Sequence, residues 1–219
     1  MNPVLALAAD AEVPDGDEWL SAPERETLAG LRFPGRRRDW RLGRWVAKRA
    51  VGAVLSEGPA EVRAAADGAP EVLVAGRPAP VAISISHRAG LGAGLAAAGG
   101  SAAGCDLELV EPHPPALAKD FFTPAELALV DRAGPEGRDL AVALVWSAKE
   151  SALKALRQGL RLDTREVEVE CWGAGPGWRP LRVRHGTRGF DGWWRLLPSG
   201  HVLTVVTDPP SGPPRSSDT

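Results

Sequence analysis

The sequence is poor in cysteine and in long apolar runs, and each scarcity excludes a class of protein. Its two cysteines, Cys105 and Cys171, show no metal-binding or redox spacing, which excludes a disulfide scaffold and favours buried thiols in a reducing cytoplasm. The longest run of small apolar residues, 91–98, is interrupted by glycine and is too short to span a bilayer. No basic segment precedes the short apolar run at the N-terminus, so we expect no signal peptide.

An excess of charge of one sign is also missing. The net charge of −2 over 219 residues gives no general attraction to nucleic acid. Apolar residues make up 44% and charged residues 25%, which predicts one large globular domain or two small ones. Lysine is much rarer than arginine in this chain. Where lysine does occur, we expect a position that requires a compact ammonium group, which can approach a phosphate or carry a proton. The four lysines are Lys48, Lys119, Lys149 and Lys154.

Groups of strands separated by long helices predict an α+β fold. Ser21 and Thr123 are the expected N-caps of two helices, each followed three residues later by glutamate. We expect the glycines at 99 and 100 to join strands 92–98 and 102–109 as a hairpin. Residues 134–137 are typical of a turn, and the Pro/Ser/Gly-rich tail 208–219 is expected to be disordered.

The segment 146–154 contains candidate catalytic residues and is expected to be helical. Apolar residues recur at spacings of three and four from 142 to 156, as on a buried helix face. Trp146, Glu150 and Lys154 are four residues apart and therefore share another face. A solvated Glu–Lys pair worth ~0.2–0.5 kcal/mol is the simpler interpretation. A catalytic acid and base pair is the alternative.

A second acidic element lies in the expected strand 102–109. Asp106 and Glu108 are two apart, so they point to the same side of that strand. With Glu150 they could supply three hard oxygen ligands, as a Mg²⁺ site requires, with Mn²⁺ as an alternative ion. An exposed strand edge is the equally simple interpretation of the Asp-x-Glu pair.

The strongest basic feature is the expected helix that begins near residue 36. Its cations recur at spacings of four, three and four, which predicts either a solvated face or a site for a phosphate-bearing ligand. These residues are Arg37, Arg41, Arg44 and Lys48.

Taken together, these segments resemble the 4′-phosphopantetheinyl transferases of the longer, Sfp-like type. The resemblance covers roughly residues 20–170, and the most specific part is the Asp-x-Glu element followed some forty residues later by the helical motif. The matching segments are Gly68-x-Pro70, Ser84-Ile85-Ser86-His87, Gly104-Cys105-Asp106-Leu107-Glu108, Phe121-Phe122-Thr123-Pro124-x-Glu126 and Trp146-Ser147-x-Lys149-Glu150-x-x-x-Lys154.

The resemblance implies a fold and a reaction. It implies a monomer of two similar α+β halves, 1–103 and 104–207, related by a pseudo-twofold axis with the cofactor in the cleft between them. Such enzymes transfer phosphopantetheine from coenzyme A to a serine of an acyl or peptidyl carrier protein and release 3′,5′-ADP. The sequence does not indicate whether the carrier belongs to fatty-acid, polyketide or nonribosomal peptide synthesis.

The resemblance also implies residue roles. Asp106, Glu108 and Glu150 would hold the metal, and Glu150 or a metal-bound water would accept the serine proton. Lys154 would neutralise the leaving phosphate. Ser86, His87 and the basic group Arg37, Arg41, Arg44 and Lys48 would contact coenzyme A. Ala69 stands where the family often has a cation, and Arg77 and Arg88 are the candidate replacements.

Two other functions fit the same residues less well. A coenzyme A-binding regulator or scaffold without activity would explain the missing cation at position 69. A metal-dependent phosphohydrolase could use the same three carboxylates without a carrier protein.

Overall fold

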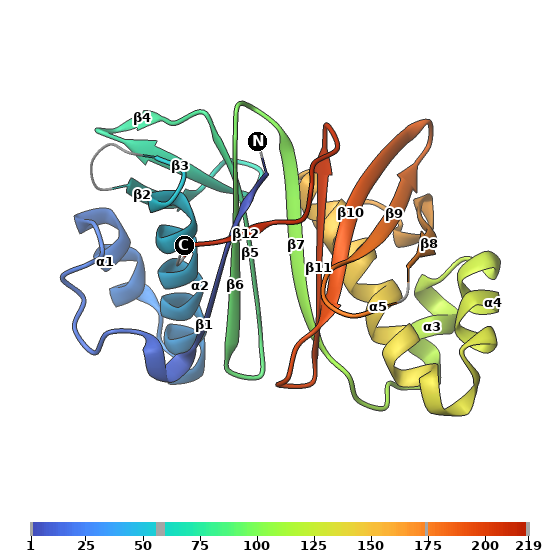
Figure 1. Cartoon of the computed structure of the whole chain (residues 1–219). Helices are drawn as coiled ribbons and strands as arrows, with labels where there is room; N and C mark the ends of the chain where they lie inside the picture. Colours follow the sequence, from blue (N-terminus) through green and yellow to red (C-terminus); the bar gives the residue numbers. More distant parts are fainter. Residues whose placement is uncertain (1, 56–59, 174, 218–219) are drawn as a thin grey trace. The chain divides into compact units, whose positions relative to one another are not determined.

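The computed structural model describes residues 2–55, 60–173 and 175–217 (Figure 1). The chain forms two compact units, Met1–Ser101 with Pro214–Thr219 and Ala102–Pro213. No helix among the described residues is long and apolar enough to cross a membrane. Both units combine helices with antiparallel sheets, so the predicted α+β class is confirmed.

The first unit packs one long helix against a four-stranded sheet. The strand order is β12-β1-β6-β5, and β2, β3 and β4 form a second sheet. Helix α2 contacts β1, β5 and β6, and its buried residues Leu42, Val46 and Val51 form the core with the sheet. The elements are β1 (Val4–Ala9), η1 (Asp10–Glu12), α1 (Ala22–Gly30), α2 (Pro34–Gly52), β2 (Ala60–Ala64), β3 (Pro70–Val74), β4 (Arg77–Pro78), β5 (Val81–Arg88), β6 (Leu91–Ala98) and β12 (Arg215–Ser216).

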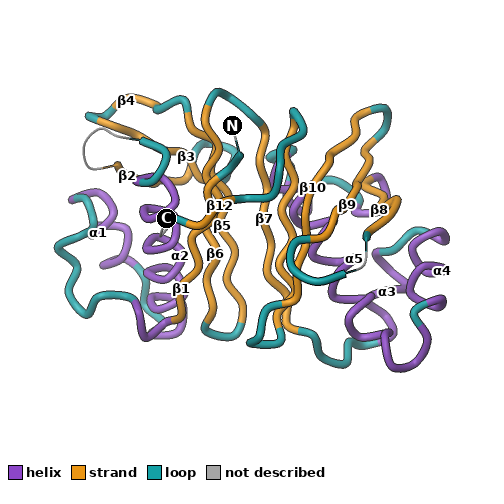
Figure 2. The backbone as a smooth tube through the Cα atoms, viewed as in Figure 1, coloured by secondary structure: helices purple, strands orange, loops and turns teal. Residues whose placement is uncertain are grey.

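The second unit repeats this plan with a longer sheet. The strand order is β7-β11-β10-β9-β8, and helix α5 packs on β7 and β11 (Figure 2). The apolar stripe predicted for the central helix is buried, with Val145, Ala148 and Ala152 fully covered. The elements are β7 (Ala102–Leu109), α3 (Pro115–Phe121), α4 (Pro124–Arg132), α5 (Gly134–Ala155), η2 (Gly159–Arg161), η3 (Thr164–Glu166), β8 (Val167–Trp172), β9 (Arg179–His185), β10 (Arg188–Leu196) and β11 (His201–Asp208).

The two units share their order of elements although the sequence shows no repeat. In each, a first strand is followed by helices, then by an antiparallel strand pair, then by a hairpin whose second strand pairs with the first strand. The hairpins are β5–β6 and β10–β11, and the first strands are β1 and β7. The expected boundary between residues 103 and 104 lies inside β7.

Both predicted N-caps are confirmed. The hydroxyls of Ser21 and Thr123 accept hydrogen bonds from the backbone of Glu24 and Glu126, and each glutamate returns the bond to the cap residue's N–H. These capping boxes begin α1 and α4 because they satisfy backbone donors that a helix start leaves without partners.

Three local predictions are wrong, and each failed for a tertiary reason. The strands β6 and β7 are not a hairpin: β6 pairs with β1 and β5, whereas β7 pairs with β11. Residues 134–137 form the first turn of α5, with Pro135 near its start where a proline needs no N–H partner. The tail is not disordered throughout, because Arg215 and Ser216 pair with β1. The side chain of Cys171, predicted to be buried, lies outside the described residues.

Candidate active site

Helix α5 lies in direct contact with strand β7, and a glycine makes this approach possible. A Cβ atom at Gly104 would lie 1.8 Å from the backbone oxygen of Ser151 and 2.9 Å from the backbone nitrogen of Ala155. Any side chain would therefore separate the two elements. The contact places the last two turns of α5 over the strand that carries Asp106.

Lys154 and Asp106 form the ion pair at this contact. The Lys154 ammonium donates to Asp106 Oδ1 at 2.7 Å and to the Cys105 carbonyl oxygen at 3.1 Å. Asp106 is 4% exposed, whereas the Lys154 side chain is 27% exposed and reaches solvent. Burial lowers the pKa of Lys154, but the charges of Asp106, Cys105 and Glu150 and the hydrogen bond to Asp106 together outweigh burial, so the pKa lies above its usual value. Lys154 is therefore a fixed cation.

Glu150 lies one turn before Lys154 on the same helix and is half-buried. Burial raises its pKa, the negative charge of Asp106 raises it further, and Lys154 partly opposes both effects. The charge of Asp106 thus acts on Glu150, and an added cation near both carboxylates would be stabilising. Asp106 on β7 and Glu150 on the facing helix α5 therefore interact electrostatically.

Glu108 is the third predicted ligand and is half-buried on β7. It pairs in register with Val202, two residues along the ladder from the Asp106–Thr204 pair, so both acids lie on one face of the strand. Among the described residues, no three His, Cys, Asp or Glu side chains are arranged closely enough to hold a metal ion. All three side chains nevertheless offer carboxylate oxygens, the type of ligand that Mg²⁺ prefers, and Asp106 Oδ1 is paired with the Lys154 ammonium.

Trp146 begins the face that carries Glu150 and Lys154. Its ring meets the ring of Phe121 edge-on at 5.3 Å between centroids, which joins α5 to the end of α3. Phe121 is 38% exposed, so an apolar surface lies one turn from Glu150. The helix face therefore carries a ring, an acid and a cation in sequence.

The segment that contains this cluster matches a family model described as ACPS: 4′-phosphopantetheinyl transferase superfamily, over residues 102–206. Residues 102–206 belong to the 4′-phosphopantetheinyl transferase superfamily. The match confirms the predicted superfamily for this segment. No curated protein matches the chain. We refer to the matched segment below as the transferase domain.

Buried hydroxyl groups hold α5 on the sheet of the transferase domain. The Thr204 hydroxyl lies 2.8 Å from Ser147 Oγ and 2.7 Å from Ser151 Oγ, and it donates to the Ser147 carbonyl oxygen. Thr204 is the register partner of Asp106, so this network lies directly beside the acidic cluster. This network was not predictable from the sequence, because serines in a helix and a threonine in a strand give no sequence signal that they contact one another.

Three of the four cations that were predicted on α2 as phosphate contacts have acceptors within their own unit. Arg37 donates to the carbonyl oxygens of Leu28 and Leu31 at the end of α1. Arg41 pairs with Asp17 and donates to the backbone of residues 14–16. Lys48 pairs with buried Glu24 at 2.8 Å and donates to the Ala60 carbonyl. These three cations are engaged by their own unit, so a phosphate would have to replace existing contacts.

Arg44 differs from the other three. Its guanidinium carbon lies 4.6 Å from the centre of the Trp40 ring. Burial lowers the pKa of Arg44, and the charge of Glu24 offsets part of that change. Its neighbour Gly43 lies close to His87, because a Cβ atom there would be 4.0 Å from His87 Cδ2. His87 is exposed at the end of β5 and Ser86 is buried. His87 therefore lies beside the middle of α2, next to Gly43, the residue that precedes Arg44.

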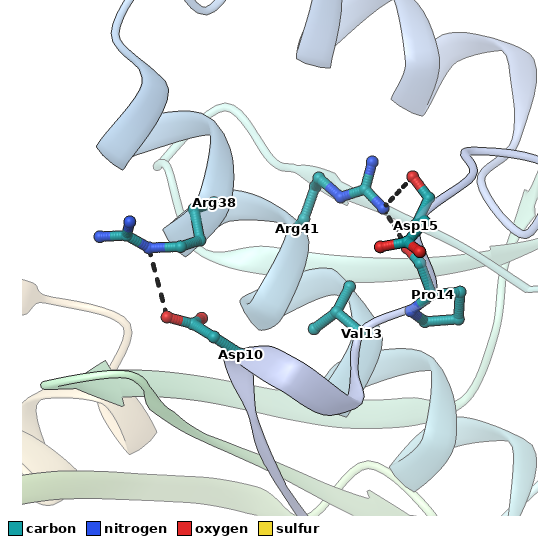
Figure 3. Close-up of a pocket in the computed structure, with 6 residues that line it drawn as sticks. All are labelled: Asp10, Val13, Pro14, Asp15, Arg38 and Arg41. Atoms are coloured by element: carbon teal, nitrogen blue, oxygen red, sulfur yellow. Dashed lines mark hydrogen bonds and ion pairs between the residues drawn. The ribbon is translucent and has the colours of Figure 1, made fainter.

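A pocket of about 280 Å³ lies beside α2 in the first unit. Figure 3 shows that the two arginines in its wall point to acceptors of the wall itself, Arg38 to Asp10 and Arg41 to the backbone of Pro14 and Asp15. Asp10 in the wall compensates the charge of Arg38, and Asp17 compensates that of Arg41. We assign no phosphate to this pocket.

Proposed function

We propose that the chain transfers 4′-phosphopantetheine from coenzyme A to a serine of an acyl or peptidyl carrier protein. The observation that carries the proposal is that the superfamily match spans the segment in which Asp106, Glu150 and Lys154 meet. In the reaction the serine oxygen forms a bond to the β-phosphorus, the bond from that phosphorus to 3′,5′-ADP breaks, and the serine proton is transferred to a base. We further propose a cytoplasmic monomer of the longer, Sfp-like type.

Three carboxylates of the transferase domain are the proposed metal ligands. Asp106, Glu108 and Glu150 would hold Mg²⁺, which when bound offsets the pyrophosphate charge and polarises the attacked phosphorus. Their support is the shared strand face of Asp106 and Glu108 and the effect of the Asp106 charge on Glu150. Glu150 is also the proposed acceptor of the serine proton, because it is half-buried beside the cluster and lies one helical turn from Lys154.

The cations have separate proposed tasks. Lys154 would stabilise the charge that develops on the leaving phosphate, since it is a fixed ammonium at the acidic cluster with a side chain that reaches solvent. Within the first unit, Arg44, Ser86 and His87 are the proposed contacts to coenzyme A. Arg37, Arg41 and Lys48 are better explained as contacts that hold the helix ends and loops.

The test is the intact mass of an apo carrier protein after incubation with the chain, coenzyme A and Mg²⁺, with and without EDTA. A gain of one phosphopantetheine that EDTA abolishes would support both the reaction and its metal dependence. The same gain should be nearly lost in Glu150→Gln and Lys154→Ala, with the fold checked by circular dichroism. Coenzyme A binding without modification of any carrier would contradict the proposal and favour a non-catalytic protein.

A further inference from the structure

Lys149 belongs to the motif that also contains Glu150 and Lys154, yet it is not part of their face. Its side chain is 0% exposed, and its ammonium pairs with Glu126 Oε2 at 2.8 Å. It also donates to the carbonyl oxygen of Thr164 at 2.8 Å and to that of Val167. All three donors of the ammonium are engaged inside the domain, so no phosphate can reach Lys149.

Glu126 completes this buried arrangement from the other side. Its Oε2 accepts the Thr123 N–H at 2.8 Å in the capping box, and its Oε1 accepts the Val169 N–H at 2.7 Å. One carboxylate therefore joins the start of α4 to strand β8, and through Lys149 to α5. A buried ion pair with this many hydrogen bonds has a single favourable geometry.

The first unit contains the same arrangement. Glu24 Oε2 accepts the Ser21 N–H at 2.7 Å and Oε1 accepts the Val62 N–H at 2.9 Å. Lys48 pairs with Glu24 at 2.8 Å and donates to the Ala60 carbonyl at 2.6 Å. In both units, the glutamate of a capping box accepts a strand N–H and pairs with a lysine of the long helix.

The residue that follows each lysine distinguishes the two copies. Lys48 is followed by Arg49, which donates to the Leu7 carbonyl, whereas Lys149 is followed by Glu150. Successive residues of an α-helix point about 100° apart around its axis. A helix whose Lys149 is locked toward Glu126 and β8 therefore has a fixed direction for Glu150.

We infer that the Lys149–Glu126 pair is a positioning device, which sets the rotation of α5 so that Glu150 is directed at Asp106. The inference rests on the proposed function, since it assigns the device to the metal-binding carboxylates. Lys149 and Glu126 are positioning residues because they contact neither the carboxylate cluster nor solvent. The Lys48–Glu24 pair belongs to the other unit and provides a matched control for metal affinity.

The test compares two double variants of the full chain, Lys149→Met/Glu126→Gln and Lys48→Met/Glu24→Gln. Each removes one ion pair, fully buried for Lys149–Glu126 and partly buried for Lys48–Glu24, without leaving an isolated charge. Urea unfolding measures stability, and Mn²⁺ titration followed by electron paramagnetic resonance measures metal affinity. We expect similar drops in the unfolding midpoint, but a 10–100-fold weaker Mn²⁺ affinity only for the first variant, as for other losses of groups that orient metal ligands.

Several results would overturn the inference. Wild-type Mn²⁺ affinity in the folded Lys149→Met/Glu126→Gln variant would show that the pair does not aim Glu150. If Mn²⁺ affinity fell equally in both double variants, the loss would be due to general destabilisation of the chain. If the first variant does not fold, Lys149→Gln/Glu126→Gln, whose amides can still hydrogen-bond, replaces it. Failure of both to fold would mean that the pair holds the domain together and does not specifically position Glu150.

Failure of the proposed function gives a different pattern. A wild-type chain that binds no Mn²⁺ and modifies no carrier would remove the metal site and the inference with it. If the wild-type chain binds Mn²⁺ and modifies the carrier, and the Lys149→Met/Glu126→Gln variant binds Mn²⁺ equally well, only the inference about the ion pair is wrong.

Discussion

The substitution Gly104→Ala tests the contact between α5 and β7 on which the candidate site depends. The new methyl group would lie 1.8 Å from the Ser151 backbone oxygen, whereas unstrained non-bonded contacts begin at about 3.5 Å. The helix and strand must therefore move apart by roughly 1.5 Å, because the obstructing atoms are backbone and cannot rotate away. Overpacking of this kind costs ~1–3 kcal/mol of stability.

The displacement should affect chemistry more than folding. A misplacement of about 1 Å near reacting groups can reduce a rate about 10²-fold. We expect Gly104→Ala to remain folded at 20 °C, with carrier modification lowered by about that factor and Mn²⁺ binding weakened. The assays are initial rates of carrier modification by mass spectrometry, Mn²⁺ titration and urea unfolding.

Gly94 provides the matched control. A Cβ atom there would lie 2.5 Å from the Val46 backbone oxygen, so Gly94→Ala forces α2 from its own sheet in the same way. It should lower stability comparably while leaving Mn²⁺ affinity unchanged. If Gly104→Ala retained wild-type turnover and Mn²⁺ affinity, the close approach of α5 would not be what positions Glu150 and Lys154, and the reasoning would be refuted.

Three further perturbations follow from buried contacts. Thr204→Val removes the hydroxyl shared by two buried serines of α5 and should cost ~1–3 kcal/mol in urea unfolding; an unchanged midpoint would contradict the network. Lys149→Met alone leaves Glu126 buried without its counter-charge and should lower the free energy of unfolding by ~3–5 kcal/mol. The loss should exceed that of the double variant with Glu126→Gln, and equal losses would contradict a buried ion pair between the two residues. Deletion of 214–219 removes the strand that pairs with β1 and should increase self-association in light scattering, because it exposes a sheet edge; a monodisperse, equally stable product would argue against this.

Local sequence patterns predicted most of the elements near the site. The helix from Thr123 begins where its capping box predicted, and the alternation around Asp106 correctly indicated a strand with both acids on one face. These features depend on residues within one or two turns, and such spacing is visible in the sequence itself. The superfamily was recognisable for the same reason, since its motifs are short runs with fixed internal spacing.

Pairing between distant segments was not predictable in this way. The glycines at 99 and 100 are compatible with a hairpin, but β6 already has partners on both of its edges, so β7 pairs with β11. The tail looked disordered because it is rich in Pro, Ser and Gly, yet two of its residues complete a sheet edge. In both cases the competing partner lies far away in the sequence.

The sequence by itself determined which residues carry chemistry: an acidic strand, a helix with Glu150 and Lys154 on one face, and a surplus of arginine on α2. Only the tertiary structure decided how each charge is used. It engages Arg41 and Lys48 within the first unit, buries Lys149 against Glu126, and leaves Lys154 at Asp106. The physical reason is that spacing sets the direction of a side chain, whereas the free energy of a buried charge depends on the partner that packing brings to it.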